Sequence, residues 1–167
     1  MVEKNDVRYP NPTKLRDGKT VLDIEHYAPF LLNAISSAWQ RKTSAIYRKS
    51  FGLSIVDWRV VAMLNIEPNI TANRICEVIR IDKAAVSRSL RLLAESGNVF
   101  SESSNVDLRK RHWVLTEKGL QTHDAFLDIA LRCDAELVAG VPNDELKTFL
   151  SIARRLLKNL DSFQISD

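Results

Sequence analysis

Apolar residues recur every three to four positions along most of the chain, the spacing that places them on one face of an α-helix. Residues 99–102 and 112–115 are instead rich in aromatic and β-branched residues, which predicts two short strands. The fold class expected is therefore mainly α with a small β-wing. The predicted helices cover residues 29–51, 54–67, 71–79, 82–96, 116–139 and 143–160.

The two central helices are short and are separated by a tight turn. Thr71 and Asp82 are residue types that cap the first turn of a helix, and Gly97 suits the left-handed conformation that ends one. The second helix carries an apolar stripe and a separate stripe of small, polar and basic side chains. Such a pair predicts a helix-turn-helix, whose second helix enters the major groove of DNA. The predicted DNA-contacting residues on it are Lys83, Ala84, Ser87, Arg88 and Arg91.

A solvated charged face is the alternative interpretation of the basic stripe, because Glu95 could pair with its arginines. The segment that follows favours DNA binding. Residues 103–111 form a polar, basic tip between the two predicted strands, and an arginine on such a wing can enter a narrow minor groove. A carboxylate would be repelled by DNA, so Asp107 is expected to hold Arg109 or Arg111 in one rotamer. The predicted wing contacts are Asp107, Arg109, Lys110 and Arg111.

Composition is compatible with this interpretation. The chain has 167 residues, of which 45% are hydrophobic, enough for a core. Lys and Arg number 24 against 21 Asp and Glu, so the net charge is only +3 and the clustering of basic residues in the middle of the chain carries more information. The predicted organisation is a flexible arm (1–20), a dimerisation helix (21–50), a winged helix-turn-helix lobe (51–118) and C-terminal dimerisation helices (119–162).

The last predicted helix has an apolar face too wide for an isolated surface helix. A two-fold partner would cover that face. It would also supply a second recognition helix about 34 Å away, as a palindromic operator requires. We therefore expect a homodimer. The predicted interface residues are Leu31, Ile35, Phe149, Leu150, Leu157 and Leu160.

Several function classes find no support in the sequence. No run of about 18 apolar residues and no secretory signal pattern occur, so we expect a cytoplasmic protein without a membrane span. Cys76 and Cys133 are too few and too far apart for a disulfide framework, and no metal-binding spacing occurs, so neither a metal nor a cofactor is expected. The sequence also lacks a nucleophile elbow and a phosphate-binding glycine loop, which argues against an enzyme.

The wing and the segment after it resemble a known pattern. Asp107-x-Arg109, followed after five residues by Leu115-Thr116-x-x-Gly119, is similar to the wing signature of the MarR family of bacterial transcriptional regulators. The resemblance runs from about Tyr27 to Leu160, and Trp113 departs from it where a smaller aliphatic residue is usual. It implies a homodimer with a winged helix-turn-helix lobe in each subunit. It also implies a repressor that a small, often aromatic, ligand releases from DNA.

The resemblance further implies a ligand site between the dimer base and the DNA-binding lobe. By analogy with the family, the expected effector is an aromatic acid or its coenzyme A thioester, which would stack on flat side chains and pair with Arg59 or Lys42. Core packing is the competing interpretation of the aromatic residues. The candidate ligand-binding residues are Trp39, Lys42, Tyr47, Trp58, Arg59, Met63, His112 and Trp113.

Two other functions stay open at this point. A winged-helix module that binds protein would carry an apolar or acidic recognition stripe, whereas this stripe contains Arg88 and Arg91. A thiol-based redox regulator would use Cys76 or Cys133 as its sensor, although neither lies in an evidently activating basic turn.

Overall fold

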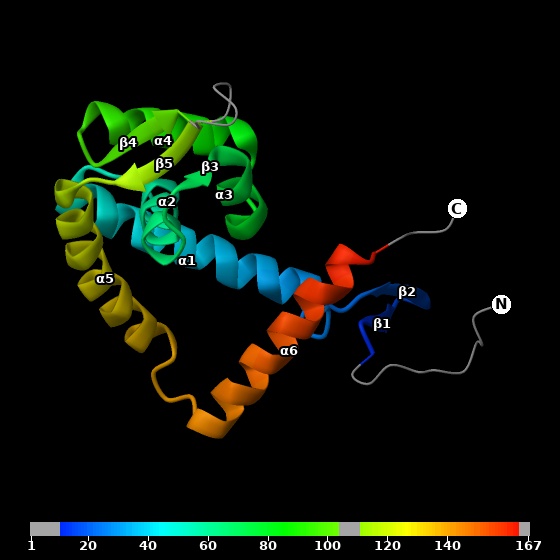
Figure 1. The fold of residues 1–167 in the computed structure, drawn as a ribbon. Coiled ribbons are helices and arrows are strands. Elements are labelled where there is room, and N and C mark those ends of the chain that lie inside the picture. Colours follow the sequence, from blue (N-terminus) through cyan, green and yellow to red (C-terminus); the bar gives the residue numbers. More distant parts are fainter. Residues whose placement is uncertain (1–10, 104–110, 164–167) are drawn as a thin grey trace. The chain divides into compact units, whose positions relative to one another are not determined.

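The computed structural model describes residues 11–103 and 111–163 (Figure 1). These residues form a mainly helical protein with a small antiparallel wing, which confirms the predicted fold class. The elements are β1 (Thr13–Arg16), β2 (Lys19–Leu22), α1 (Ala28–Phe51), α2 (Ile55–Ile66), β3 (Ile70–Thr71), α3 (Ala72–Ile79), α4 (Lys83–Glu95), β4 (Val99–Ser103), β5 (Arg111–Leu115), α5 (Glu117–Leu137) and α6 (Asn143–Asp161). The chain divides into two compact units, Met1–His123 and Asp124–Asp167, and the boundary between them in the sequence falls within α5.

Side-chain caps set the starts of the central helices where the sequence predicts them. Ser54 and Asp57 form a reciprocal capping box at the start of α2. Thr71 accepts a hydrogen bond from the backbone N–H of Arg74 at the start of α3, and Asp82 accepts one from Ala85 at the start of α4. Each cap satisfies a backbone donor that has no partner within its helix.

The apolar stripes of α2, α3 and α4 meet in one core. Each buried aliphatic side chain of this kind contributes about 1.5–3 kcal/mol to folding. Because the stripe of α4 is buried, its opposite face is left to solvent. The core side chains that are at most 2% exposed on these three helices are Val60, Val61, Leu64, Ile75, Val86, Leu90 and Leu93.

The wing is part of a three-stranded sheet with the order β3–β5–β4. Strand β5 pairs antiparallel with β4, with Val99 opposite Leu115, and the sequence predicts this hairpin to within one residue at each strand. Strand β3 was not predicted. It contains only Ile70 and Thr71, which lie opposite Trp113 and His112. A two-residue strand has no periodicity of its own, so only its pairing with β5 reveals it.

The segment before α1 differs from the predicted flexible arm over residues 1–20. Residues 13–22 form an antiparallel hairpin, β1–β2, closed by a turn in which Asp17 has φ 52° and Gly18 φ 73°. Two positive φ angles at the centre of a two-residue loop give the twist that matches paired strands, which is why Asp-Gly favours hairpins. Residues 1–10 lie outside the described part of the chain.

The second unit contains the end of α5 and the whole of α6. Helix α6 begins at Asn143, as the sequence predicts, after Pro142 and a left-handed Gly140. None of its residues is buried. Its leucine and phenylalanine side chains are therefore available to a further chain.

Candidate nucleic-acid interface

Helix α4 presents the predicted recognition stripe to solvent. All five predicted residues on it are exposed, whereas Val86, Leu90 and Leu93 on the opposite side are buried. The turn from α3 into α4 passes through Arg80, whose φ of 53° and ψ of 46° lie in the left-handed region. This turn changes the direction of the chain within three residues, so that α3 and α4 both pack against α2 and against each other.

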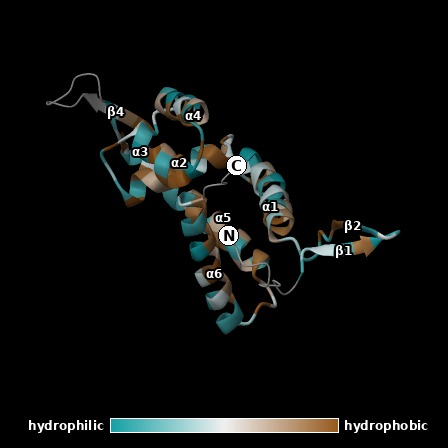
Figure 2. Ribbon diagram, turned by 90° about the vertical axis from the view of Figure 1, so that its right-hand side faces the viewer, coloured by the Kyte–Doolittle hydropathy of each residue, from teal (hydrophilic) through white to brown (hydrophobic). Residues whose placement is uncertain are grey.

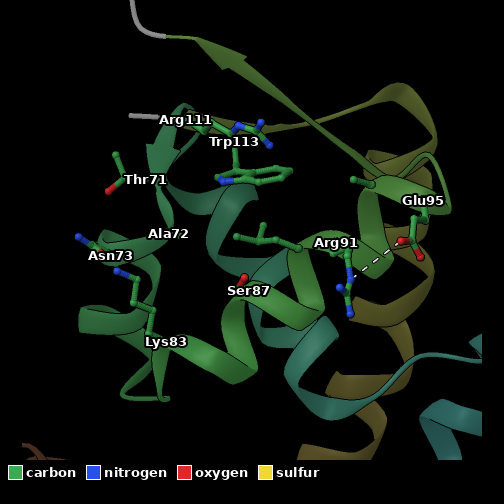
Figure 3. A pocket seen from close by; sticks show the side chains of 11 residues that line it. Thr71, Ala72, Asn73, Lys83, Ser87, Arg91, Glu95, Arg111 and Trp113 are labelled. Atoms are coloured by element: carbon green, nitrogen blue, oxygen red, sulfur yellow. Dashed lines mark ion pairs between the residues drawn. The ribbon is translucent and has the colours of Figure 1, made fainter. Parts of the chain in front are cut away.

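A groove of about 810 Å³ lies between the start of α3, helix α4 and strand β5 (Figure 3). Lys83, Ser87 and Arg91 of the stripe border it from α4, and Arg111 and Trp113 border it from β5. The structure therefore brings α4, the predicted recognition helix, and the described start of the wing to one surface. The other residues that line the groove were not among the predicted contacts; they are Thr71, Ala72, Asn73, Leu90, Ala94 and Glu95.

The charges along this groove are mostly positive. Lys83, Arg91 and Arg111 face it together with one carboxylate, Glu95. Arg91 Nε lies 4.0 Å from Glu95 Oε1, and both side chains are more than 70% exposed. A pair this exposed is worth no more than about 1 kcal/mol, so a phosphate or a base edge can displace Glu95 from Arg91.

Arg88 and Ala84 are exposed but do not line the groove. Arg88 borders a smaller cavity of about 210 Å³ at the junction of α2 and α4, together with Ser54 and Asp57. Asp107, Arg109 and Lys110 lie outside the described residues. Arg111, the first residue of β5, is the one predicted wing contact that the described chain includes, and it is exposed.

A buried carboxylate fixes α4 to the start of α2. Asp57 is only 6% exposed and accepts three short hydrogen bonds. Its Oδ2 accepts from the backbone N–H and the hydroxyl of Ser54, each at 2.7 Å, and its Oδ1 accepts from Ser89 Oγ at 2.6 Å. Ser89 belongs to the buried side of α4 and was not singled out from the sequence. The only available signal was a hydroxyl next to an apolar stripe.

A second polar cluster fixes the C-terminal end of α4 to the start of α5. Thr116 Oγ1 donates to the carbonyl oxygen of Gly97 at 2.7 Å and accepts from the backbone N–H of Gly119 at 3.0 Å. Thr122 Oγ1 donates to Asn98 Oδ1 at 2.7 Å. A side chain at position 119 would overlap the carbonyl oxygen of Asn98. The Leu-Thr-x-x-Gly part of the wing signature thus joins the recognition helix closely to α5.

The candidate effector residues fall into different environments. Tyr47 and Met63 are buried at 1% and 5% exposure, and Lys42 is exposed. Trp58 packs against His123 of α5 with their ring centroids 5.7 Å apart. Trp113 borders the groove on the recognition-helix side. Trp39, Arg59 and His112 are half-buried.

The six predicted interface residues are all exposed in the single chain. Leu31 and Ile35 of α1 are 44% and 49% exposed. On α6 the exposed fractions are 49% for Phe149, 42% for Leu150, 45% for Leu157 and 62% for Leu160. Apolar side chains exposed in such numbers along two helices are typical of an oligomer interface.

Within residues 11–103 and 111–163, no three His, Cys, Asp or Glu side chains are grouped as a metal site would need. Cys76 and Cys133 are both free and half-buried. None of the helices described is both long and apolar enough to span a membrane.

Comparison with known proteins identifies this fold. Residues 51–110, which contain α2, the helix-turn-helix and the start of the wing, match the model of the MarR family. Over these residues the chain is similar to the MarR family. It is also 38% identical over 61 residues to the HTH-type transcriptional regulator PetP of Rhodobacter capsulatus, a match that covers 36% of this chain and 37% of PetP.

MarR-family structures share the fold over most of the chain. A MarR/EmrR family transcriptional regulator from Acinetobacter sp. ADP1 aligns with a TM-score of 0.79 and 23% identity, covering 85% of this chain and 100% of that one. The PcaV transcriptional regulator from Streptomyces coelicolor, solved in complex with its natural ligand, aligns with a TM-score of 0.72 and 18% identity over 83% of this chain and 96% of that one. At these identities the likeness establishes the fold.

Proposed function

We propose that this chain is a DNA-binding transcriptional regulator of the MarR family that acts as a homodimer and is not an enzyme. The observation that carries the proposal is the groove that Lys83, Ser87 and Arg91 share with Arg111. A cationic surface that joins an exposed helix to the base of a β-wing suits duplex DNA, whose phosphates dominate affinity and whose major groove admits a helix.

Each side chain has a separate role in this proposal. Ser87 and Arg91 face outward from the middle of α4, where they can reach base edges, and Arg91 can bind guanine with two hydrogen bonds. Lys83 lies in the first turn of α4 and binds a phosphate, as Arg111 does from β5. Arg109, on the wing tip, enters the adjacent minor groove.

The homodimer follows from the exposed apolar helices and from the symmetry of operators. An isologous contact through α1 and α6 would cover the leucines exposed on both helices, and would place two recognition helices against two half-sites. Charged substitution of Leu150 and Leu157 should therefore give monomers or aggregates that lose operator binding. If the double variant sediments as a stable dimer, this interface is refuted.

Repression and release by a small molecule complete the proposal. The PcaV structure contains a natural ligand, which shows that this fold can bind one in a relative. We propose an aromatic acid or an aryl coenzyme A thioester as effector, bound near the half-buried Trp39 and Arg59. Such a ligand would release the dimer from a palindromic operator if it bound more tightly to a conformation whose two DNA-binding lobes are wrongly spaced for the two half-sites.

The test is binding of the full chain to the DNA upstream of its own gene, measured by fluorescence anisotropy at several salt concentrations. Arg91→Ala should weaken binding by about 1–3 kcal/mol at each salt concentration, as expected for an arginine that reads a base edge. Arg132→Ala on α5 is a matched control, because Arg132 is 70% exposed and also pairs with a carboxylate one helical turn away. Equal affinity of both variants for that DNA would contradict the proposed interface.

A further inference from the structure

The hairpin β1–β2 has two chemically different faces, and Figure 2 shows hydrophobic and hydrophilic residues along it. Residues that lie opposite each other in an antiparallel pair share a face, and neighbours along a strand alternate. Leu15 pairs with Thr20 and Leu22 with Thr13, so both leucines lie on one uncharged face. The other face carries Val21 and three cations, Lys14, Arg16 and Lys19.

Hydrogen bonds and ion pairs of Asp23 attach the hairpin to the turn before α1. The backbone N–H of Asp23 donates to the carbonyl oxygen of Pro12 at 2.8 Å, which closes the open end of the hairpin. The Asp23 carboxylate, 14% exposed, accepts from Lys14 Nζ at 3.2 Å and lies 3.0 Å from His26 Nδ1. These contacts tie β1 to the turn that leads into α1, so the hairpin has a fixed attachment.

The uncharged face is left open in the single chain. Leu15 is 76% exposed and Leu22 is 49% exposed, and Ile24 beyond them is 45% exposed. Among the described elements, β1 and β2 have their extensive contacts only with each other. A two-stranded hairpin is at best marginally stable alone in water, so this one needs a surface against its apolar face.

We infer that the Leu15–Leu22 face packs against a second copy of this chain, so that each hairpin is an arm that extends the dimer interface. This inference rests on the proposed homodimer. The arm leads directly into α1, where Phe30, Leu31 and Ile35 are 44%, 44% and 49% exposed. The apolar surface is therefore continuous from the hairpin along the helix that the dimer has to cover.

Charge decides between a second copy and DNA as the occupant. DNA would select the face with Lys14, Arg16 and Lys19, because phosphates bind cations. The leucine face carries no charge, and the matching exposed surfaces on this chain are the apolar sides of α1 and α6. In a two-fold dimer every such contact occurs twice, so each small arm would add an identical patch of buried apolar surface to the dimer interface.

The test compares two double variants of the full chain. The Leu15→Ser, Leu22→Ser variant removes the apolar face. The Arg16→Ser, Lys19→Ser variant is the control, because it places the same number of serines on the opposite face of the same hairpin. The leucine variant should raise the dimer dissociation constant, or the rate of subunit exchange, on the order of tenfold or more, and the control should leave both near wild type.

A second measurement detects the contact itself. Equal amounts of ¹⁴N- and ¹⁵N-labelled wild-type chains are mixed, left to exchange and treated with a lysine-reactive cross-linker. Cross-links from Lys14 or Lys19 that join a light peptide to a heavy one support the arm. Cross-links from these lysines only within one isotope would overturn it, as would a leucine variant that dimerises like wild type.

The outcomes separate this inference from the homodimer. A monomeric wild-type chain would refute the dimer and the arm together. A dimeric wild type whose leucine variant is unchanged would refute the arm alone. If only the Arg16 and Lys19 variant weakens operator binding, and the leucine variant dimerises normally, the hairpin contacts DNA and the inference is wrong.

Discussion

Ser89 Oγ donates a 2.6 Å hydrogen bond to Asp57 Oδ1 across the interface between α4 and α2. Both residues are buried, at 5% and 6% exposure, and Ser54 occupies the other oxygen of Asp57. One carboxylate therefore caps α2 and holds α4 at a fixed rotation. The exposed stripe of α4 faces outward because its opposite side is held in this way.

Ser89→Ala should destabilise the chain and weaken DNA binding together. The substitution removes the only hydrogen bond to Asp57 Oδ1 among those described, which costs about 1–3 kcal/mol when the acceptor is buried. Urea denaturation measures this loss. Ser87→Ala is the matched control, because Ser87 is exposed on the same helix and should change operator affinity with little effect on stability. Unchanged stability of the Ser89 variant would show that water or a shifted rotamer replaces its bond.

Gly119→Ala should destabilise the chain by about 2 kcal/mol or more, because its Cβ would meet the backbone carbonyl of Asn98, which cannot move freely. Thermal unfolding measures the change. Lys118→Ala is the control, since it removes an exposed hydrogen bond to the Ser96 carbonyl and adds no atoms. A Gly119 variant as stable as wild type would mean that α5 approaches Asn98 less closely than described.

Arg109→Ala should weaken operator binding by about 1–3 kcal/mol and leave dimerisation and thermal stability unchanged. The physical reason is that an arginine expected at the tip of a wing is far in sequence from the predicted core and dimer contacts, so its loss should mainly remove an interaction with DNA. Position 109 lies outside the described residues, so this prediction rests on the sequence. A gel-shift titration in which the variant dimer keeps full affinity would rule out this role for Arg109.

The attachment of the hairpin should depend on acid pH. The hydrogen bond with His26 is the largest cause that lowers the pKa of Asp23 from 3.8, followed among the lowering causes by Lys14 and the backbone N–H of Glu25, against an opposing effect of burial. A lowered pKa means that the folded state stabilises the charged form of the Asp23 carboxylate. This contribution to stability is complete above pH 3.8, the unfolded value, and is lost as the pH falls through the lowered pKa of the folded state.

Amide chemical shifts of residues 13–22 measure this effect. They should move toward unfolded values at acid pH in the wild type, while the helices remain intact by circular dichroism. Asp23→Asn should show the loosened hairpin already at neutral pH. Unperturbed hairpin shifts in that variant would contradict the role of Asp23.

Local chemistry explains why so much of the lobe was predictable. Ser54, Thr71 and Asp82 each satisfy backbone donors within three residues, so their effect on helix starts is visible in the sequence. Asp17-Gly18 is a residue pair typical of turns, but the mainly polar residues around it do not alternate clearly. The hairpin was therefore missed, although its turn residues favour one.

The sequence by itself determined the helices, their caps, the β-wing and the cationic stripe of α4, because periodicity and capping act over a few neighbouring residues. Only the tertiary structure decided which stripe residues face a common groove with Arg111, and that Arg88 does not line it. It also decided that Ser89 meets Asp57 and that Gly119 meets Asn98. These contacts join residues more than twenty positions apart, and such proximity follows from packing, which leaves no local pattern in the chain.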